Sequence, residues 1–549
     1  MVDRMSPTFA KRVVVIPAVK KNVAFPDDLV KRLAGETLLH RCLRLAKQIE
    51  TDKKLRVLTD SLEIELECKR EGIPVRVDPT FNLADLSSVE VRNLLRGDFI
   101  GPCEEILILW PYTPQLSAQT IDAATQRFRL ESCDLLLSLQ QDARPSFQAA
   151  DHDLTSLVHL SPTNRQVESR GFSILRSEAL SSTDPLKTIG HELPEEVLEI
   201  RSYRDWWVCE KLIKRKRIAF RVIGSHQIGM GHVYRSLALA REITDHEIVF
   251  FCEEKDQLAV NGIAGADYLV ETCSDAEAVE ERLLDYRPHL LVNDVLDTSG
   301  TYVQKMRTNG SCVVNFEDLG PGSLHANLVI NELYEKPCGH AALPEANAVW
   351  GNEYLFLREE FTRATPHETP EQIHDVLVTF GGADPSNYTG LAIRALLPEI
   401  ETQDARVHVV LGKGYLYGNT LRNTYEGHPN VRFHNGSATM SELMETCQLA
   451  ICSNGRTPYE LAHMRVPAIV LSQNDREEAH SFASRESGFV RLGILRGEGA
   501  LPTLRKELCA LIHSPQLFAE KHAAQARFNF SQNRAKVARL VLKVIPKNE

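Results

Sequence analysis

Short apolar runs alternate with longer stretches of helical spacing along most of the chain. The predicted strands are 12–17, 54–58, 105–109 and 134–138, then 218–223, 248–252, 289–292 and 312–316, and then 375–380, 406–411, 430–433, 449–452 and 467–471. Between the first two runs, Leu38, Leu39, Cys42 and Leu43 recur at the spacing of one helix face. Buried strands that alternate with helices predict an α/β fold with mostly parallel sheets covered on both faces.

The strand–helix rhythm restarts twice, after the basic segment Lys211–Arg217 and after the polar stretch 362–372. We therefore expect three α/β units, at 1–213, 218–362 and 373–549. The last two units each open with a strand that runs into a glycine-rich loop. Paired α/β halves of this kind bind ligands in the cleft between them, at the carboxyl ends of the strands.

Composition narrows the class of protein. Hydrophobic residues make up 43% and charged residues 25%, which excludes disorder, collagen-like repeats and a small disulfide scaffold. The net charge of −11 argues against nucleic acid or an anionic membrane as partner and favours small molecules. No apolar run approaches the ~20 residues of a membrane span, and the first residues look like a buried strand and not a signal peptide. The 12 scattered cysteines predict reduced thiols, no zinc site and a cytoplasmic location.

The segment 223–232 carries the first candidate site. Gly229 and Gly231 allow a tight turn close to a ligand, and the helix that follows presents free N–H groups suited to phosphate. His232, at that helix start, could take a proton near neutral pH. In isolation, the glycines could equally form a plain turn and the histidine a helix cap.

Two further loops follow predicted strands, at 380–387 and 452–460. Thr457 and Glu460 have the spacing of a capping box, which predicts a helix start there. Each loop alone could be an ordinary tight connection. Three phosphate-suited loops at strand ends of paired halves favour nucleotide binding.

The segments IGMGHVYRSLALA, YLFLREEF (354–361), FGGADPSN and SNGRTPYELAHMRVPAIVL resemble one family over most of residues 218–490. This family contains the UDP-sugar hydrolase of pseudaminic acid biosynthesis and its spore-coat polysaccharide relatives. The resemblance implies a two-lobed glycosyltransferase-B fold, with a first lobe at 218–362 and a nucleotide-binding second lobe at 373–549. It implies a UDP-sugar as substrate and neither metal nor cofactor for this module.

The same resemblance implies residue roles. His232 would be the catalytic base that activates water or an acceptor hydroxyl, and Glu460 would hold the ribose. The other residues expected at the nucleotide and its phosphates are Gly229, Gly231, Arg235, Gly381, Gly382, Asp384, Asn454, Gly455, Arg456 and Thr457. The candidate substrate-binding residues are Asp294, Asn474 and His480.

The chain departs from that family in two places. The stretch 293–297 lacks the family's aromatic residue, and Asp475 replaces a glutamine after Asn474. These changes leave open whether water or a sugar hydroxyl is the acceptor. An alternative interpretation makes solvated loop residues of Asp294, Asp297, Asp318 and His480.

The N-terminal region resembles the acylneuraminate (CMP-sialic acid type) cytidylyltransferases. The matching segments are 16–18, 33–38, 57–75, 83–91, 110–122 and 198–212, which span nearly all of residues 12–213. The resemblance implies a nucleotidyltransferase-like (glycosyltransferase-A-like) α/β domain and a homodimer formed through it.

The residues that hold CTP in that family are replaced here. Val19 stands where the family has arginine, Lys20, Lys21 and Asn22 replace Gly-Gly-Ser, and Val23 and Asp28 replace two lysines. Arg201 aligns with a metal-binding aspartate, and a cation there would abolish magnesium coordination. We therefore favour a degenerate domain; Mg²⁺ would be needed only if it were active. Thr59, Asp60 and Asp85 remain, as ligands or as helix caps.

Together these patterns predict a sugar-nucleotide enzyme of nonulosonic acid (sialic or pseudaminic acid) or surface polysaccharide biosynthesis. Its C-terminal module would hydrolyse or transfer the glycosyl group of a UDP-sugar. One alternative is a bifunctional enzyme that also forms a CMP-nonulosonate from CTP. Another is a catalytically dead scaffold that binds nucleotide sugars.

Overall fold

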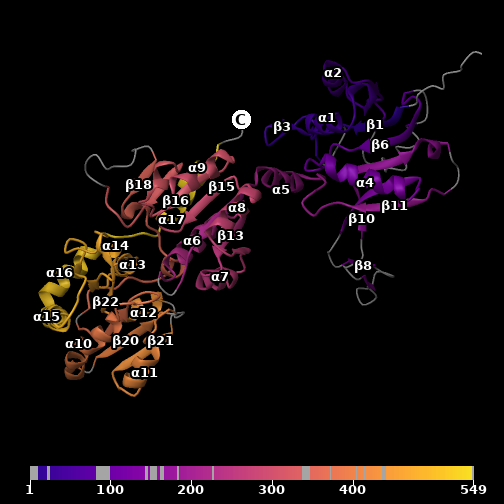
Figure 1. Ribbon diagram of the computed structural model, residues 1–549. Helices are drawn as coiled ribbons and strands as arrows, with labels where there is room; N and C mark the ends of the chain where they lie inside the picture. The colour runs from indigo at the N-terminus through magenta and orange to yellow at the C-terminus, as the bar shows by residue number, and fades with distance from the viewer. Residues whose placement is uncertain are drawn as a thin grey trace, which may run out of the picture. The chain divides into compact units, whose positions relative to one another are not determined.

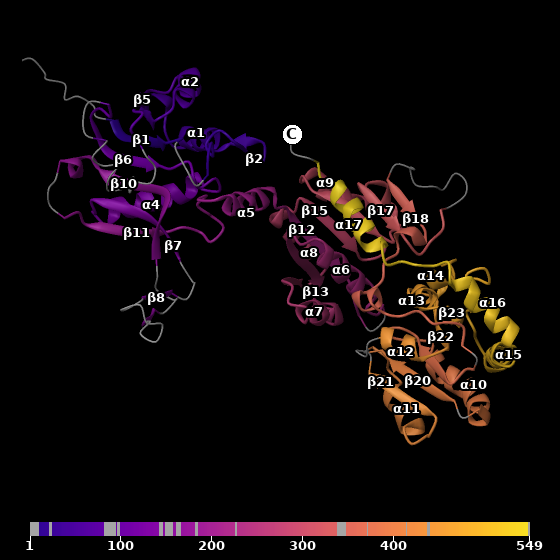
Figure 2. The same cartoon turned by 180° about the vertical axis from the view of Figure 1, so that it is seen from behind.

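The computed structural model describes residues 10–20, 25–81, 95, 99–141, 146–148, 158–160, 166–181, 185–225, 228–336, 347–370, 372–403, 405–412, 414–435 and 440–546. The chain forms two compact units, unit 1 (1–215) and unit 2 (216–548). Figures 1 and 2 show their elements from opposite sides.

Unit 1 is built on one mixed sheet with the strand order β11-β7-β10-β6-β1-β4-β5. Its strands are β1 (Ala10–Ala18), β4 (Leu55–Thr59), β5 (Val75–Val77), β6 (Cys103–Leu109), β7 (Leu135–Gln141), β10 (Gln166–Arg176) and β11 (Thr188–Glu192). Strand β10 runs antiparallel to β6 and β7, and the remaining neighbours are parallel. This arrangement is the expected nucleotidyltransferase-like α/β fold.

The helices of unit 1 cover this sheet. They are α1 (Leu38–Ile49), α2 (Leu62–Arg70), α4 (Ala118–Leu130) and α5 (Tyr203–Lys214). Helix α1 begins where the Thr37 side chain accepts a hydrogen bond from the His40 backbone N–H, 3.1 Å away. It buries Leu38, Leu39 and Cys42, which confirms the predicted helix. Short strand pairs join β2 (Arg32–Leu33) to β3 (Glu36–Thr37) and β8 (Ser146–Gln148) to β9 (Val158–Leu160).

The first lobe of unit 2 is a seven-stranded parallel sheet with the order β14-β13-β12-β15-β16-β17-β18. The strands are β12 (Arg217–Val222), β13 (Glu247–Glu253), β14 (Val270–Cys273), β15 (Leu290–Asp294), β16 (Cys312–Phe316), β17 (Leu328–Asn331) and β18 (Ala348–Trp350). The helices are α6 (Gly231–Glu242), α7 (Gln257–Ala264), α8 (Ala276–Tyr286) and α9 (Gly300–Thr308). The strand order reverses at β12, because β13 and β14 follow on one side of it and β15 to β18 on the other.

The second lobe is a six-stranded parallel sheet with the order β21-β20-β19-β22-β23-β24. Its strands are β19 (Asp375–Thr379), β20 (Arg406–Leu411), β21 (Val431–Asn435), β22 (Leu449–Ser453), β23 (Ala468–Leu471) and β24 (Phe489–Gly493). Its helices are α10 (Tyr388–Gln403), α11 (Gly418–Tyr425), α12 (Met440–Thr446), α13 (Thr457–Met464), α14 (Asp475–Glu478), α15 (Ala500–His513) and α16 (Pro515–Gln525). Two such parallel-sheet lobes make unit 2 a glycosyltransferase-B-like module.

The last helix, α17 (Asn533–Lys543), differs from the expected boundary of the second lobe at 373–549. It packs on α6, and Val537, Ala538 and Val541 are buried in the core of the first lobe. Figure 2 shows α17 against the sheet of the first lobe, between the labels of β15 and β17. Because its apolar face has the ordinary helical pattern, the sequence did not show which lobe it covers.

The predicted strands are confirmed to within one or two residues at most ends. Strand β10 was missed because its sequence, QVESRGFSILR, mixes polar residues with a glycine. Strands β2, β3, β5, β8, β9, β11, β14, β17, β18 and β24 were also missed, and each of them has only two to five residues. Eleven cysteines lie in the described part of the chain, and all of them are free thiols. Within that part, no helix combines the length and apolar character needed to cross a bilayer.

Candidate functional site

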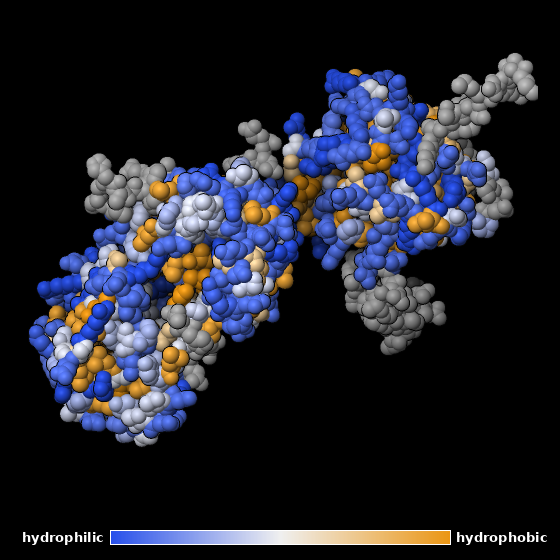
Figure 3. Space-filling model, in the orientation of Figure 1, coloured by the Kyte–Doolittle hydropathy of each residue, from blue (hydrophilic) through white to orange (hydrophobic). Residues whose placement is uncertain are grey.

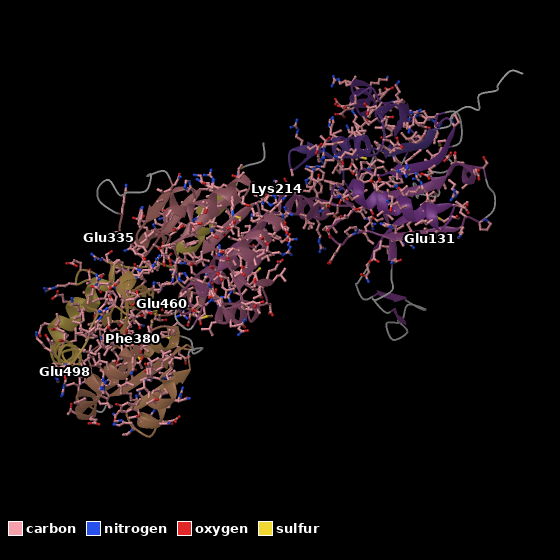
Figure 4. All side chains as sticks on the ribbon, viewed as in Figure 1. Glu131, Lys214, Glu335, Phe380, Glu460 and Glu498 are labelled. Carbon is pink, nitrogen blue, oxygen red and sulfur yellow. The ribbon has the colours of Figure 1, made fainter. Side chains whose placement is uncertain are left out.

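A cavity of about 370 Å³ lies between the two lobes of unit 2, and we call it the interlobe cavity. Its walls are the loops that follow β12, β19 and β22, together with the segments 355–358 and 473–480. Phe380 and Glu460, which Figure 4 labels, line it from the second lobe. Figure 3 shows this face of unit 2 hollowed between the lobes, with hydrophobic residues beside the hollow. The volume is typical of a small-molecule site.

His232 lines this cavity from the first turn of α6. Its Nδ1 lies 2.6 Å from Oδ1 of Asp294, the last residue of β15. Burial alone would raise the pKa of Asp294, but Arg235 and His232 hold it well below its usual range. Because the carboxylate is ionised and can only accept, His232 donates its Nδ1–H to it. The lone pair of the imidazole is then on Nε2.

Arg235 holds a cluster of carboxylates behind His232. Its guanidinium is 1% exposed and donates to Asp294 (2.8 Å from Nε to Oδ2), Glu332 (2.8 Å) and Glu317. Arg235 lies in the cavity wall with its N–H groups engaged by these carboxylates, and its contact with a nucleotide stays a prediction. Asp294 is fully buried and absent from the cavity wall, so it positions His232 and does not reach a substrate.

Glycines of the two lobes meet at one end of the interlobe cavity. Gly229 has φ +84°, and a Cβ on Gly382 would lie 2.8 Å from its Cα. A Cβ on Gly231 would lie 3.9 Å from Cδ of Arg456, in the other lobe. The Gly381 carbonyl also approaches Gly412, where a Cβ would come within 2.3 Å. These loops thus need glycine for the close approach of backbone to backbone.

Helix α13 points its N-terminus at the cavity, where Gly455, Arg456 and Thr457 form part of the wall. The guanidinium of Arg456 donates to the Phe356 carbonyl at 2.6 Å and pairs with Glu332. Burial and the nearby Arg235 lower the pKa of Arg456 to about 10, so it is charged at neutral pH. A helix N-terminus with an arginine beside it suits a diphosphate.

The helix start predicted at Thr457 is confirmed, but Thr457 and Glu460 do not form a capping box. The helix cap is Arg456, and no side chain caps it. Glu460 lines the cavity, and its Oε1 accepts a hydrogen bond from Nε of Arg358 at 3.0 Å. Burial raises the pKa of Glu460 against the pull of Arg358. Glu460 is thus placed on the cavity wall, as expected for a ribose ligand.

Two predicted nucleotide-binding side chains have structural partners. Asp384 reaches the cavity wall, but its carboxylate accepts from the Tyr388 and Thr389 N–H groups at 2.9 and 2.8 Å and so caps α10. Asn454 is 1% exposed and lies outside the wall. Its amide donates to the Glu477 carbonyl at 2.7 Å, which ties the loop after β22 to the loop after β23.

The residues that the sequence left as either substrate ligands or solvated loop residues fall into two groups. Asn474 lines the cavity and caps α14, and His480 lines it while its Nδ1 donates to the Asn454 carbonyl at 2.6 Å. Asp318 is fully buried and accepts from Thr298 Oγ1 at 2.6 Å. The solvated interpretation is therefore wrong for Asp294, Asp318 and His480, and it fits the half-exposed Asp297.

Sequence reasoning missed four charged residues of the cavity wall, Glu317, Arg358, Arg476 and Glu477. Arg476 reaches across to the first lobe, where it donates to Asp297 at 3.1 Å and to the Glu317 carbonyl. Burial raises the pKa of Glu477 to about 7. Arg358 lies within the matching segment 354–361, which could have suggested it, and the place of Arg476 and Glu477 after β23 could have suggested these two.

In unit 1, the strand end that would face CTP is neutralised. Lys20 pairs with Glu63 and, at 3.2 Å, with Asp27, and its backbone N–H donates to Asp60 at 2.6 Å. Arg201 pairs with Glu199 at 2.6 Å. Lys21, Asn22, Val23 and Asp85 lie outside the described residues. Among the residues that are described, no group of three or more His, Cys, Asp or Glu is placed to hold a metal ion.

No protein-family model matches the chain. It is 29% identical over 274 residues to an uncharacterized protein of Methanocaldococcus jannaschii, an alignment that covers 47% of this chain and 56% of that protein. It is 25% identical over 272 residues to the spore coat polysaccharide biosynthesis protein SpsG of Bacillus subtilis, which covers 48% of this chain and 80% of SpsG. The chain thus spans little more than half the length of the archaeal relative.

Solved structures resemble each unit. MurG of Acinetobacter baumannii matches 60% of this chain and 99% of its own, with 13% identity and a TM-score of 0.43. A CMP:2-keto-3-deoxy-manno-octonic acid synthetase complexed with CTP matches 37% of this chain and 99% of its own, with 13% identity and a TM-score of 0.29. The folds of the two units are defined by the strand orders given above.

Proposed function

We propose that unit 2 binds a nucleoside-diphosphate sugar in the interlobe cavity and cleaves the bond between its anomeric carbon and the diphosphate. The observation that carries this proposal is the His232–Asp294 pair, with an Nδ1–Oδ1 distance of 2.6 Å, in the wall of a cavity that the N-terminus of α13 also faces. His232 is suited to take a proton, and the N-terminus of α13 is suited to hold the leaving diphosphate.

The proton path follows from the hydrogen bond to Asp294. His232 accepts the proton of the attacking hydroxyl on Nε2, while Asp294 stabilises the imidazolium that forms. The hydroxyl oxygen bonds to the anomeric carbon, the bond to the diphosphate oxygen breaks, and the electron pair leaves with the diphosphate. Water as the attacking group gives hydrolysis, and a sugar hydroxyl gives glycosyl transfer.

The leaving diphosphate is held by the second lobe. The positive end of the α13 dipole and the charged Arg456 oppose the negative charge that develops on it. Glu460, on the same helix, is placed to accept hydrogen bonds from the ribose, with Arg358 fixing one of its oxygens. Asn474 and His480 would contact the sugar from the other side of the cavity.

We propose a UDP-sugar of surface polysaccharide or nonulosonic acid biosynthesis as the substrate. The similarity to SpsG, a spore coat polysaccharide biosynthesis protein, supports the first of these pathways. Unit 2 would need neither metal nor cofactor, and the protein would act in the cytoplasm. Pairing of two chains through unit 1 stays a prediction.

We propose that unit 1 is degenerate and serves as a scaffold or a sugar-binding domain. The engagement of Lys20 by Glu63 and Asp27 supports this, because it takes this lysine away from a triphosphate. The ion pair of Arg201 with Glu199, at 2.6 Å, puts a cation where the related enzymes hold a metal.

The experiment is to incubate the protein with a panel of UDP-sugars and to measure the UDP released. His232→Ala should lower the rate by about a hundredfold or more, since general base catalysis contributes about 10²–10⁴. His513→Ala, which removes a half-exposed histidine on α15 outside the cavity, is the matched control. Equal rates for the wild type and His232→Ala would remove His232 from the mechanism. Tight UDP binding without turnover of any sugar would favour the scaffold alternative.

A further inference from the structure

Unit 1 has a cavity of its own, of about 240 Å³, which we call the α1–α4 cavity. Its walls are one face of α1, residues of the loop 110–116 after β6, and the start of α4. Val19, Lys20, Asp28 and Arg201 are the described residues at the positions that the resemblance assigns to CTP and its metal, and they lie outside this wall. The α1–α4 cavity and the candidate CTP site therefore share none of these residues.

Three buried polar groups belong to residues of this wall and have no hydrogen-bond partner among the described residues. Trp110 is 2% exposed and Thr113 is 4% exposed, and both the Trp110 Nε1–H and the Thr113 hydroxyl are unpaired. The third is Nε of Arg41, whose other nitrogens lie 2.8 Å from the Leu33 carbonyl and 3.5 Å from Glu36. Indole and guanidinium N–H groups can only donate. Because an unmade hydrogen bond of a buried donor is costly, these groups need an acceptor that a ligand would supply.

The charge of this wall is positive. Its ionised residues are Arg41 and Arg44, and no carboxyl group lines it among the described residues. Both arginines face one carboxylate outside the wall, Glu36, to which Arg44 donates at 2.8 and 3.1 Å. Two guanidinium groups and one carboxylate leave one positive charge. Helix α4, which Ser117 caps by accepting from the Thr120 N–H at 3.2 Å, adds the positive end of its dipole.

The remainder of the wall is mostly apolar, and the cavity is small. Leu45, Pro111, Pro114 and Leu116 line it beside the donors. Apolar side chains of this kind pack against the C–H groups of a sugar ring. The volume lies below the range of about 300–1,000 Å³ that is usual for small-molecule sites, so a single sugar unit suits the cavity better than a nucleotide sugar.

We propose that the α1–α4 cavity binds a single sugar unit through an anionic oxygen group, either a carboxylate or a phosphate. Anionic oxygens accept several hydrogen bonds at once, and bonds to ionised groups are about twice as strong as bonds between neutral ones. Arg41, Trp110 and Thr113 would donate to these oxygens, and the N-terminus of α4 would oppose their charge. This inference deepens the proposal that unit 1 is a sugar-binding domain, and it does not depend on catalysis in unit 2.

The test is calorimetry of the full chain with glucuronic acid, glucose 6-phosphate and neutral glucose. At least one of the two anions should bind about tenfold more tightly than glucose, and their comparison shows which anionic group the cavity takes. Gln48→Glu puts a carboxylate into the wall at an exposed position of α1 and should weaken the binding of that anion by about tenfold. Gln126→Glu, the same change at an exposed position of α4 outside the wall, should leave it unchanged.

Thr113→Val tests one of the unpaired groups without adding charge. The variant keeps the branched shape of the side chain and removes a buried hydroxyl that has no partner among the described residues, so the melting temperature of the free protein should not fall. The binding of the anion should weaken by about fivefold, because one hydrogen bond to it is lost. A lower melting temperature would mean that the protein itself uses this hydroxyl, and unchanged binding would mean that the hydroxyl does not meet the ligand; either result contradicts the proposal.

The binding data decide the proposal as a whole. No binding of either anion, equal binding of glucose, or anion binding that Gln48→Glu leaves unchanged would overturn the α1–α4 cavity as an anion site. A titration of the same protein with UDP tests the interlobe cavity separately. Failure of this inference is therefore distinguishable from failure of the function proposed for unit 2.

Discussion

His232 depends on a carboxylate that solvent does not reach. Asp294 is fully buried, and Arg235 shares it with the histidine through its own hydrogen bonds. Removal of one partner of such a buried charge pair is costly, because the other is left uncompensated. The buried Asp294 carboxylate therefore serves both the proton transfer proposed for His232 and the stability of the first lobe.

The charge of Glu477, in the wall of the interlobe cavity, changes with pH near neutrality. Burial raises its pKa from the usual 4.5 to about 7, so the folded chain favours the protonated form. That contribution to stability is complete below the ordinary carboxyl range and is lost as pH rises through about 7. A UDP-sugar does not titrate in this range, and ionised Glu477 would repel its diphosphate.

We therefore expect the affinity for a UDP-sugar to fall by about tenfold between about pH 6 and about pH 8. Calorimetric titrations at several pH values measure this. Glu477→Gln should flatten the profile, whereas Glu478→Gln, the next residue of α14 and absent from the cavity wall, should retain it. A flat profile in the wild type would show that Glu477 does not face the diphosphate.

Between elements, the decisive contact is the one between the glycine loops of the two lobes. The sequence predicted these loops and their glycines from their place after apolar strands. It did not predict that Gly229 and Gly382 approach each other, because a contact between residues 153 positions apart leaves no trace in local pattern. Arg358 and Arg476, which bridge the lobes by ion pairs, were missed for the same reason.

Gly382→Ala tests this contact. The new Cβ would lie 2.8 Å from the Gly229 Cα and 3.2 Å from the Met230 N, both of them backbone atoms of the other lobe. The lobes would be held apart, and we expect the affinity for UDP-sugars to fall by about tenfold or more while each lobe stays folded. Gly427→Ala is the control, since nothing lies within 4 Å of its new Cβ. Equal affinity of Gly382→Ala and the wild type would mean that the loops need not touch.

Single side chains in these loops were less predictable than the loops themselves. Asp384 and Asn454 stand in the right segments, but one caps α10 and the other ties two loops together. Asp and Asn compete for backbone N–H groups wherever a helix begins near them. The sequence alone does not show which use prevails.

For the whole molecule, the two units differ in what their sites retain. Unit 2 has the His232–Asp294 pair in a cavity wall and a charged arginine at a helix N-terminus, and unit 1 has a nucleotidyltransferase-like sheet beside which Lys20 and Arg201 are paired within the protein. The fold of each unit followed from the order of its strands and helices. The sequence did not show that α17 packs on the first lobe and completes its core.

We expect unit 1 to release no pyrophosphate from CTP, Mg²⁺ and N-acetylneuraminic acid above the rate without protein. The physical reason is that Lys20 is engaged by Glu63 and Asp27, and that Arg201 would repel a metal at the position the resemblance assigns to it. A coupled pyrophosphate assay of the full chain measures this. Release that depends on both the protein and Mg²⁺ would establish the bifunctional alternative.

The most direct test of the account is a crystal structure of the full chain with UDP. We predict the diphosphate between the loops of Gly382 and Gly455, with His232 on the side where the sugar would be attached. Nucleotide bound in unit 1 near Val19 and Arg201, with the interlobe cavity unoccupied in the same crystal, would contradict it.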